Sequence, residues 1–454
     1  MMNKILLALF IFSSSLVADD WPTYMNDYRR SGVSKSQLSP NLKHKWTIKS
    51  KASPQTAWSN PAKWDAYSGN DKLQSLRNFD PAFFVSGSGS DMYYGSSVDN
   101  AVHCVDINTS KEKWVFFTNG PVRFPPTIYK GKLYFGSDDG FVYCISTEGK
   151  LIWKYQAVPK ARMISSNGKI ISTWPVRTGV IVRDEKVYFA ASLVPWEPSY
   201  VCCVNSENGK EIYKQEHKEI TLEGAILITP DRLIIPQGRA SALMFDLKSG
   251  KHAGHLGNAG STFIILTEDQ KVIAGPKNQR AKGNVVNIAD SKSKTNMAQL
   301  DGTDRMIIDG HMAWYHKNGR MTCMDRVSYA DNSFARSKLL NEKKGIQKKL
   351  KKMNETQKKE AAARVKAIDS EIKSLSASIS KTTIWNVESM MPISFIKAGN
   401  HIVCGMKDKV TLIDSKNGKT VWSQTIDGKA YGLMTCNGYL VVSTDNGNIY
   451  CFGK

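Results

Sequence analysis

The 454-residue sequence predicts an all-β fold, an eight-bladed β-propeller closed by an N-terminal strand, with a helical insertion in the sixth blade. Three observations lead to this prediction. A pattern of strands and turns recurs about every forty residues, the last copy stops one strand short, and an Ala/Lys/Glu-rich stretch without proline interrupts the series. Repeats of about forty residues are typical of blades built from four short strands.

The composition is that of a folded, strongly basic protein. Hydrophobic residues make up 41% and charged residues 23% of the chain, which excludes a wholly disordered protein. The 62 Lys and Arg against 41 Asp and Glu give a net charge of +21. Such a charge predicts attraction to anionic partners without naming one.

Residues 1–18 have the pattern of a secretory signal peptide. Lys4 gives a positive start, Ile5 to Phe12 an apolar stretch, and Ser13 to Ala18 a cleavage region. The apolar run is too short to span a bilayer. We therefore expect an exported protein, periplasmic or extracellular, whose propeller occupies residues 19–454.

The repeat is clearest where residues 132–144 match residues 439–451 without a gap. One column, in the expected third strand of each unit, is small or apolar throughout: Cys104, Cys144, Cys203, Met244, Ile288, Cys323, Leu412 and Cys451. A second column, after the following turn, is aromatic: Trp114, Trp153, Tyr213, Trp385 and Trp422. A large ring at one repeated place can wedge between neighbouring units and bury much apolar area.

Both ends of the chain contribute to the predicted closure of the ring. The last unit stops at Lys454 after its third strand, and residues 45–48 could supply the missing fourth strand, with Trp46 in the aromatic column. A blade built from both ends would hide the edges of its sheet. An open solenoid is the alternative and would leave both ends unpaired.

These motifs resemble those of a known family. The Gly-Lys-x-x-Trp turns and the Gly-Ser-Asp-Asp-Gly hairpin at 136–140 look like the PQQ-like, or quinoprotein-type, β-propeller repeats. Further segments resemble a secreted bacterial branch of that family: 21–24, 30–32, 64–67, 77–81, 120–124 and 174–179. The resemblance covers roughly residues 20–330 and 385–454. It implies the fold but not one activity, because propellers host many functions.

The insertion, residues 334–381, is a different kind of sequence. It holds 14 basic and 5 acidic residues, a net charge of +9, and its composition favours helix. Apolar residues follow coiled-coil spacing at Val365, Ile368, Ile372, Leu375 and Ile379. We expect two antiparallel helices joined near residues 354–356, with one long helix as the alternative. Its charge indicates one of two things. The helices present a solvated face, or they bind a protein partner or an anionic surface.

The eight cysteines are expected to be mostly buried thiols, because five of them share one repeat column. The adjacent Cys202 and Cys203 need separate treatment. Quinoprotein alcohol dehydrogenases carry a disulfide between adjacent cysteines, but here the pair lies within an expected strand. Neighbouring side chains of a strand point to opposite faces, so we favour two separate thiols over a bridge.

No catalytic residue and no metal ligand is predicted. Only His252 and His255 among the histidines are closely spaced, and no cysteine or carboxylate lies near them at the spacing of a zinc site. The calcium ligands and base that a PQQ dehydrogenase requires are not identifiable. The cofactor is therefore left unknown, with PQQ as a possibility that no identifiable ligand supports.

Alignment of the first strands places Arg123 and Arg177 near one end of the central channel, in consecutive blades. The candidate ligand-binding residues are Arg123, Arg177, Trp174, Trp196, Asp80 and Glu197. Two neighbouring guanidiniums can bind a carboxylate or phosphate. Alternatively, both arginines pair with these acids and seal the channel.

The sequence thus favours an exported, non-catalytic binding or scaffold propeller, with a ligand or partner protein bound at the channel mouth or at the helical insertion. The alternative is a PQQ-dependent dehydrogenase that oxidises an alcohol or sugar. No nucleic-acid partner is expected, since no recognition motif accompanies the basic charge.

Overall fold

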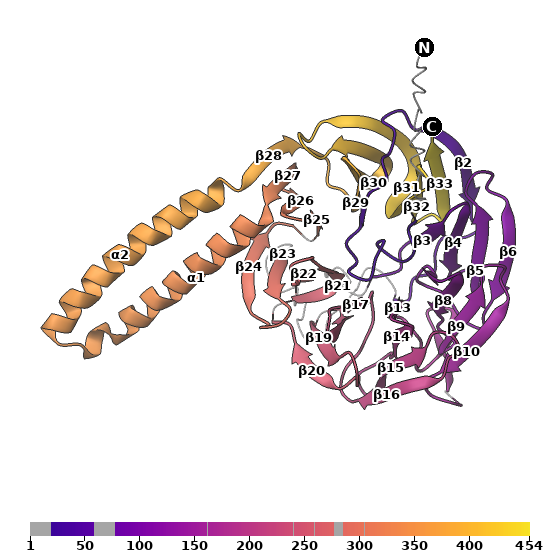
Figure 1. Ribbon diagram of the computed structural model, residues 1–454, viewed down its shortest axis with the longest axis horizontal. Helices are drawn as coiled ribbons and strands as arrows, with labels where there is room; N and C mark the ends of the chain where they lie inside the picture. Colours follow the sequence, from indigo (N-terminus) through magenta and orange to yellow (C-terminus); the bar gives the residue numbers. More distant parts are fainter. Residues whose placement is uncertain are drawn as a thin grey trace, which may run out of the picture.

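The computed structural model describes residues 20–58, 78–160, 162–238, 240–257, 259–276, 285–303 and 305–454. The predicted signal segment, residues 1–18, and the motif at 64–67 lie outside this range. Sheets of antiparallel strands stand around a common centre, and a pair of helices projects from the ring (Figure 1). The fold is therefore an all-β propeller of four-stranded units.

Six sheets in the described part of the chain have four strands each. In chain order they are β3–β6 (Val85–Ser88, Asp91–Ser96, Ala101–Asp106, Glu112–Phe117), β7–β10 (Thr127–Tyr129, Lys132–Gly136, Phe141–Ser146, Leu151–Gln156), β13–β16 (Ile181–Arg183, Lys186–Ala191, Ser199–Asn205, Glu211–His217), β17–β20 (Leu227–Ile228, Arg232–Gln237, Ala240–Asp246, His252–His255), β21–β24 (Ala259–Leu266, Lys271–Pro276, Val285–Asp290, Asn296–Asp301) and β25–β28 (Met306–Asp309, Met312–Lys317, Arg320–Asp325, Thr383–Glu388). A separate hairpin, β11–β12 (Met163–Ser166, Lys169–Ser172), lies between the second and third of them.

The remaining strands form one seven-stranded sheet in the order β1-β29-β30-β31-β32-β33-β2. Their bounds are β1 (Val33–Ser34), β2 (Lys43–Lys49), β29 (Ser394–Ala398), β30 (His401–Asp414), β31 (Thr420–Cys436), β32 (Tyr439–Thr444) and β33 (Asn448–Gly453). The two long strands bend where the backbone has positive φ, at Asp408 and Gly428. At the far edge β2 pairs antiparallel with β33, so that Trp46 lies opposite Cys451. The N-terminal strand thus joins the last strand of the chain.

The aromatic column docks several of the sheets on their neighbours. Each tryptophan donates its indole N–H to a backbone carbonyl in the following turn, as in Trp46 to Ile107, Trp114 to Thr147, Trp153 to Ser206, Trp385 to Ser415 and Trp422 to Leu42, at 2.8–3.0 Å. The ring lies flat against a turn glycine. A Cβ added to Gly209, which has φ of +69°, would approach Trp153 to 2.7 Å. The Gly-Lys turn of one repeat therefore accepts the tryptophan of the repeat before it.

The segment before β2 crosses the centre of the ring (Figure 1). Its backbone bonds to the inner strands of several sheets: Trp21 with Gly87, Pro22 with Ile128, Tyr28 with Ile228, Arg29 with Leu266, and Gly32 with Lys397. The short β1 adds in parallel to β29. Because its polar backbone groups are satisfied in this way, the segment can lie inside the channel.

Two antiparallel helices fill the interval between β27 and β28: α1 (Arg326–Lys349) and α2 (Glu355–Ser380), joined through a short 3-10 turn at Leu350–Lys352. Asp325 caps the start of α1, and Asn354 and Gln357 form a capping box at the start of α2. Ile368, fully buried, lies in the seam. The helices begin eight residues before the expected boundary at 334, because Asp325 ends β27 and caps α1 at once.

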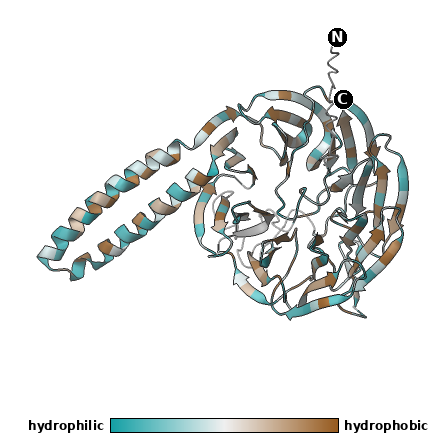
Figure 2. Ribbon diagram, viewed as in Figure 1, coloured by the Kyte–Doolittle hydropathy of each residue, from teal (hydrophilic) through white to brown (hydrophobic). Residues whose placement is uncertain are grey.

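The base of this hairpin is fixed to the neighbouring sheet. Arg326 donates two hydrogen bonds to the carboxylate of Asp269, at 3.0 and 2.5 Å, and its side chain is 4% exposed. The Tyr329 hydroxyl donates to the Gln299 carbonyl at 2.8 Å. In Figure 2 hydrophilic residues predominate along both helices. None of the described helices combines the length and apolar character needed to cross a membrane.

All eight cysteines are buried free thiols. Cys202 and Cys203 are consecutive in β15, where Cys202 pairs with Phe189 and Cys203 with Tyr188 of β14. Burial raises the pKa of Cys203 to about 12. Both side chains are part of the packing between sheets rather than a reactive pair.

Candidate functional site

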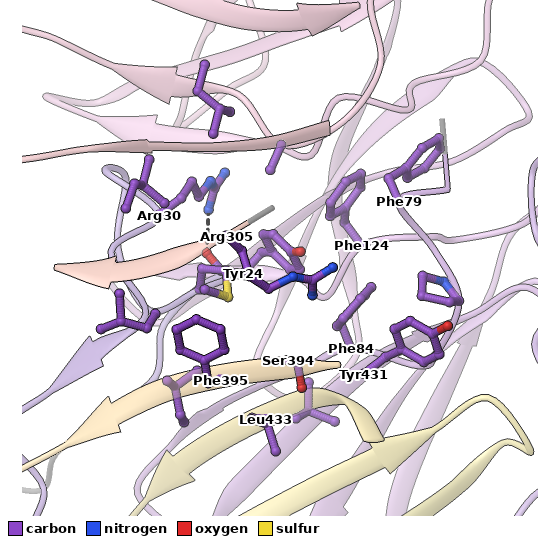
Figure 3. A pocket seen from close by; sticks show the side chains of 18 of the residues that line it. Tyr24, Arg30, Phe79, Phe84, Phe124, Arg305, Ser394, Phe395, Tyr431 and Leu433 are labelled. Carbon is purple, nitrogen blue, oxygen red and sulfur yellow. Dashed lines mark hydrogen bonds between the residues drawn. The ribbon is translucent and has the colours of Figure 1, made fainter. Parts of the chain in front are cut away.

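The centre of the ring holds a cavity of about 140 Å³ (Figure 3). Aromatic side chains from the N-terminal segment, from the loops before β3 and β7, and from β29 and β31 line it: Trp21, Tyr24, Phe79, Phe84, Phe124, Phe395 and Tyr431. The rings of Phe79 and Phe124 are stacked, with centroids 5.5 Å apart. Such a wall offers flat apolar surfaces to a small ligand.

Two guanidiniums and an amide add polar character to this cavity. Arg305 extends into it (Figure 3) and donates to the Ile393 carbonyl. Arg30 is fully buried and bonds to Ile226 and to Tyr24 through their carbonyl oxygens, each at 2.9 Å. The Oδ1 atom of Asn78 is buried without a hydrogen-bond partner among the described residues. A ligand with an acidic group or a hydrogen-bond donor would suit these atoms.

Beside the cavity lies a buried charge cluster, here called the Arg123–Arg177 cluster, of Arg123, Arg177, Asp138 and Asp80. Both arginines converge on one carboxylate: Arg123 bonds Asp138 at 2.7 Å through Nε, and Arg177 bonds it at 2.9 and 2.7 Å. Arg123 also pairs with Asp80. The side chains of all four are at most 3% exposed.

Burial alone would raise the pKa of Asp138, but attraction to Arg123 and Arg177 and their hydrogen bonds outweigh it and hold the pKa below its ordinary value. Asp138 is therefore an anion that bridges two cations. The cluster and the cavity share their chain segments, since Phe79 precedes Asp80 and Phe124 follows Arg123.

Two buried polar atoms of the cluster have no hydrogen-bond partner among the described residues. They are the Nη1 atom of Arg177 and the Oδ1 atom of Asp80. The Arg177 guanidinium lies 5.5 Å from the ring centroid of Trp58, whose indole donates to Glu223 at 2.7 Å. These groups are the places where a small polar ligand or water could bind.

The other predicted site residues lie apart from this cluster. Trp174 is half-buried and donates to the Pro198 carbonyl at 2.7 Å. Trp196 is 78% exposed, and Glu197 pairs with Arg162 at 2.6 Å near the surface. The structure thus brings together Arg123, Arg177 and Asp80, but not Trp196 or Glu197.

Sequence reasoning missed Asp138 and Arg305. Asp138 belongs to the Gly-Ser-Asp-Asp-Gly hairpin, which was interpreted only as a repeat motif, and its counterpart in the last repeat, Asp445, is not fully buried. Its pairing with two arginines depends on how neighbouring sheets face each other. Arg305 lies just before β25, and no repeated residue pattern in the sequence pointed to it.

The described residues do not fit the PQQ and calcium set of a quinoprotein dehydrogenase. Within the described ranges, no three His, Cys, Asp or Glu side chains are grouped as metal ligands would be. Cys202 and Cys203 are separate thiols, and the buried carboxylates Asp80 and Asp138 are bonded to arginines.

Sheets arranged around a channel and joined by repeated tryptophan docking define a β-propeller. A family profile described as "Outer membrane protein assembly factor BamB" matches residues 50–216. Over these residues the chain is similar to the PQQ-like repeat propellers, the family that its turn motifs resemble. A comparison with curated proteins found no match.

Solved structures with the same fold include two enzymes and a designed protein. A europium-containing methanol dehydrogenase aligns with a TM-score of 0.58 at 10% identity, over 96% of this chain and 98% of that one. The quinohemoprotein alcohol dehydrogenase ADHIIG from Pseudomonas putida HK5 aligns with a TM-score of 0.59 at 12% identity, over 96% and 80%. The computationally designed Ika8 protein aligns with a TM-score of 0.54 at 10% identity, over 84% and 98%. Such low identities show the fold alone.

Proposed function

We propose that this protein is an exported, non-catalytic binding or scaffold propeller. The observation that carries the proposal is the Arg123–Arg177 cluster, in which Asp138 and Asp80 are bonded to guanidiniums. Asp138, held as the anion between two cations, is a poor general base, because its pKa lies below the range that proton abstraction needs. The cluster instead supports a fixed, charged wall for binding.

We further propose that the ring has eight blades. The seven-stranded sheet supports this count if it is divided into two blades at Gly428, within β31, with β1 as an added inner strand. The six four-stranded sheets then complete the ring, and β2 is the fourth strand of the last blade. The insertion belongs to the sixth blade in this count.

The ligand site in this proposal is the central cavity with its charged wall. A small ligand with a flat apolar body would lie among Phe84, Phe124 and Tyr431, with its acidic group toward Arg305. Arg123, Arg177 and Asp80 would act by holding the wall, whereas Trp174 lies apart from it. Trp196 and Glu197, at the surface, would serve only a larger partner at the channel mouth.

The helical insertion is proposed as a second binding element, an arm for a protein partner or an anionic surface. Its fixed base supports this role, since Arg326 and Tyr329 hold it in one direction. Export rests on residues 1–18. The profile's description connects its namesake with outer membrane assembly, which agrees with a role in the cell envelope.

The decisive experiment supplies PQQ and Ca²⁺ to the purified protein and measures dye-linked oxidation of alcohols and sugars. We expect no turnover above a sample without protein. A quinoprotein dehydrogenase assayed in parallel shows that the assay works. Turnover that needs both PQQ and Ca²⁺ would establish the dehydrogenase alternative and refute the non-catalytic proposal.

A further inference from the structure

The outer end of the helical hairpin concentrates positive charge. This hairpin tip, residues 344–360, contains seven lysines against two glutamates, a net charge of +5 in seventeen residues. All seven lysines are exposed: Lys344, Lys348, Lys349, Lys351, Lys352, Lys358 and Lys359. Lys358 pairs with Glu355, and the other six form no ion pair with a described carboxylate.

The rest of the insertion, residues 334–343 and 361–381, holds 7 basic and 3 acidic residues, and part of this charge is paired internally. Arg364 bonds Glu342 on the facing helix at 2.7 Å and Glu371 on its own helix at 3.1 Å. Lys343 pairs with Asp369 across the seam at 2.5 Å. Cross-helix pairs thus hold the two helices together, and the positive charge is densest at the tip, with +5 in 17 residues against +4 in the other 31 residues of the insertion.

Helix stability explains only part of this distribution. Lys348 and Lys349 lie in the last turn of α1, where the helix dipole favours cations. Lys358 and Lys359 lie near the start of α2, where the same effect opposes them. Lysines at both helix ends therefore indicate selection for charge at this end of the hairpin rather than for helix formation.

The tip stands well away from the propeller. A helix of 24 residues such as α1 is about 36 Å long, several times the Debye length of about 10 Å at 0.1 M salt. A charged surface that meets the tip is thus screened from the rest of the protein. Because Arg326 and Asp269 fix the base, such a contact would also set the distance between that surface and the ring.

The side chains at the tip suit a diffuse anionic surface better than a folded protein. Residues 344–360 contain no arginine, although arginine and aromatic residues are the usual anchors of protein interfaces and lysine is depleted there. No large hydrophobic side chain of either helix is exposed. Lysine, a flexible and strongly hydrated point charge, is suited to spread phosphate groups.

We propose that the hairpin tip docks the propeller on anionic phospholipid bilayers. The contact is electrostatic and peripheral, with lysine ammonium groups against lipid phosphates and the tip apolar residues kept in the helix seam. This inference rests on the proposed arm function of the insertion and specifies a lipid bilayer as what the arm binds. Each exposed lysine contributes about fivefold to the membrane affinity of a polybasic segment, so four lysines decide whether binding is detectable.

Vesicle co-sedimentation tests this with the chain from Asp20 onward. Vesicles of phosphatidylcholine alone are compared with vesicles that contain phosphatidylglycerol, at low and at high salt. The tip variant replaces Lys348, Lys349, Lys351 and Lys352 with Gln. The matched control replaces four exposed lysines of the ring turns, Lys111, Lys150, Lys251 and Lys419, with Gln. Both variants lose the same total charge, and circular dichroism checks that each is folded.

We expect wild type and the control variant to bind phosphatidylglycerol vesicles at low salt and to release them at high salt. The tip variant should bind at least tenfold more weakly, and phosphatidylcholine should bind none of them. Equal binding by the two variants, or no binding by wild type, overturns the lipid proposal. Suppose that wild type does not bind vesicles, but that wild type and the control variant bind an acidic protein or a nucleic acid and the tip variant does not. The lipid proposal then fails, while the arm function stands.

Discussion

Arg177 donates two hydrogen bonds to the carboxylate of Asp138, at 2.9 and 2.7 Å, and both side chains are at most 1% exposed. The same carboxylate accepts from Arg123 of the preceding sheet. One buried anion therefore connects residues that precede the inner strands of two adjacent sheets. This contact is structural first, and any ligand at the channel binds beside it rather than to free guanidiniums.

Replacing Asp138 with Asn should destabilise the protein by about 3–5 kcal/mol, because two buried guanidiniums lose their shared anion. Urea unfolding followed by tryptophan fluorescence measures the change. Glu197→Gln is the control, since Glu197 pairs with a mostly exposed Arg162 and should cost less than about 1 kcal/mol. Similar losses for the two variants would show that the cluster is not a stabilising element.

Gly209→Ala should destabilise the protein by about 2–4 kcal/mol, through backbone strain at φ +69° and a collision of the new Cβ with Trp153. Gly131 has φ of +71° and open space around it, so Gly131→Ala carries the strain alone, about 1 kcal/mol. The difference between the two unfolding free energies isolates tryptophan docking. If the variants are equally stable, the flat contact contributes nothing.

The histidines give the stability a predictable pH dependence. His103 lies between Asp99 and Glu112, at 2.9 and 2.8 Å; burial lowers its pKa, but the two acids outweigh burial and raise it above 6.5. The folded state then holds this proton more tightly than the unfolded state. Its stabilisation is full below pH 6.5 and is lost as the pH rises through the raised pKa. His103→Gln should remove that decline from the unfolding free energy measured against pH.

His217 provides the opposite sign for comparison. Burial lowers its pKa, so its contribution is present above pH 6.5 and is lost as the pH falls through the lowered value. His217→Gln should flatten the acid side of the same curve and leave the alkaline side unchanged. Identical curves for wild type and both variants would contradict the assignment of these shifts.

Replacing residues 334–381 with a short Gly-Ser linker should leave the melting temperature nearly unchanged, since long loops close at modest entropic cost. That replacement keeps Arg326 and Tyr329. A deletion of 326–381 also removes the two contacts to Asp269 and Gln299. This variant should have a lower melting temperature than wild type, with a free energy of unfolding reduced by about 1–3 kcal/mol. If the variant with the linker in place of 334–381 is unfolded, the helices belong to the core.

The repeat alone was enough to predict the propeller, the pairing of Trp46 with the last strand, and two helices between the third and fourth strands of one unit. Those features follow from local patterns, because period, turn residues and aromatic spacing are written along the chain. The start of α1 was placed eight residues late, since Asp325 ends a strand and caps a helix and so carries both signals. Trp196 and Glu197 were grouped with the arginines by nearness in sequence, and the structure puts them at the surface.

What only the tertiary structure decided is which charges meet. The sequence shows Arg123 and Asp138 in one repeat and Asp80 and Arg177 in the repeats before and after it, and many acids of the chain could have paired with the arginines. The rotation between neighbouring sheets brings Asp138 within 2.9 Å of both. The course of the N-terminal segment across the channel, which closes one side of the cavity with Tyr24 and Arg30, is likewise set by long-range backbone bonds that leave no period in the sequence. Pairing with the two arginines then keeps Asp138 an anion, because an unpaired charge in the interior would cost more than the fold could offset.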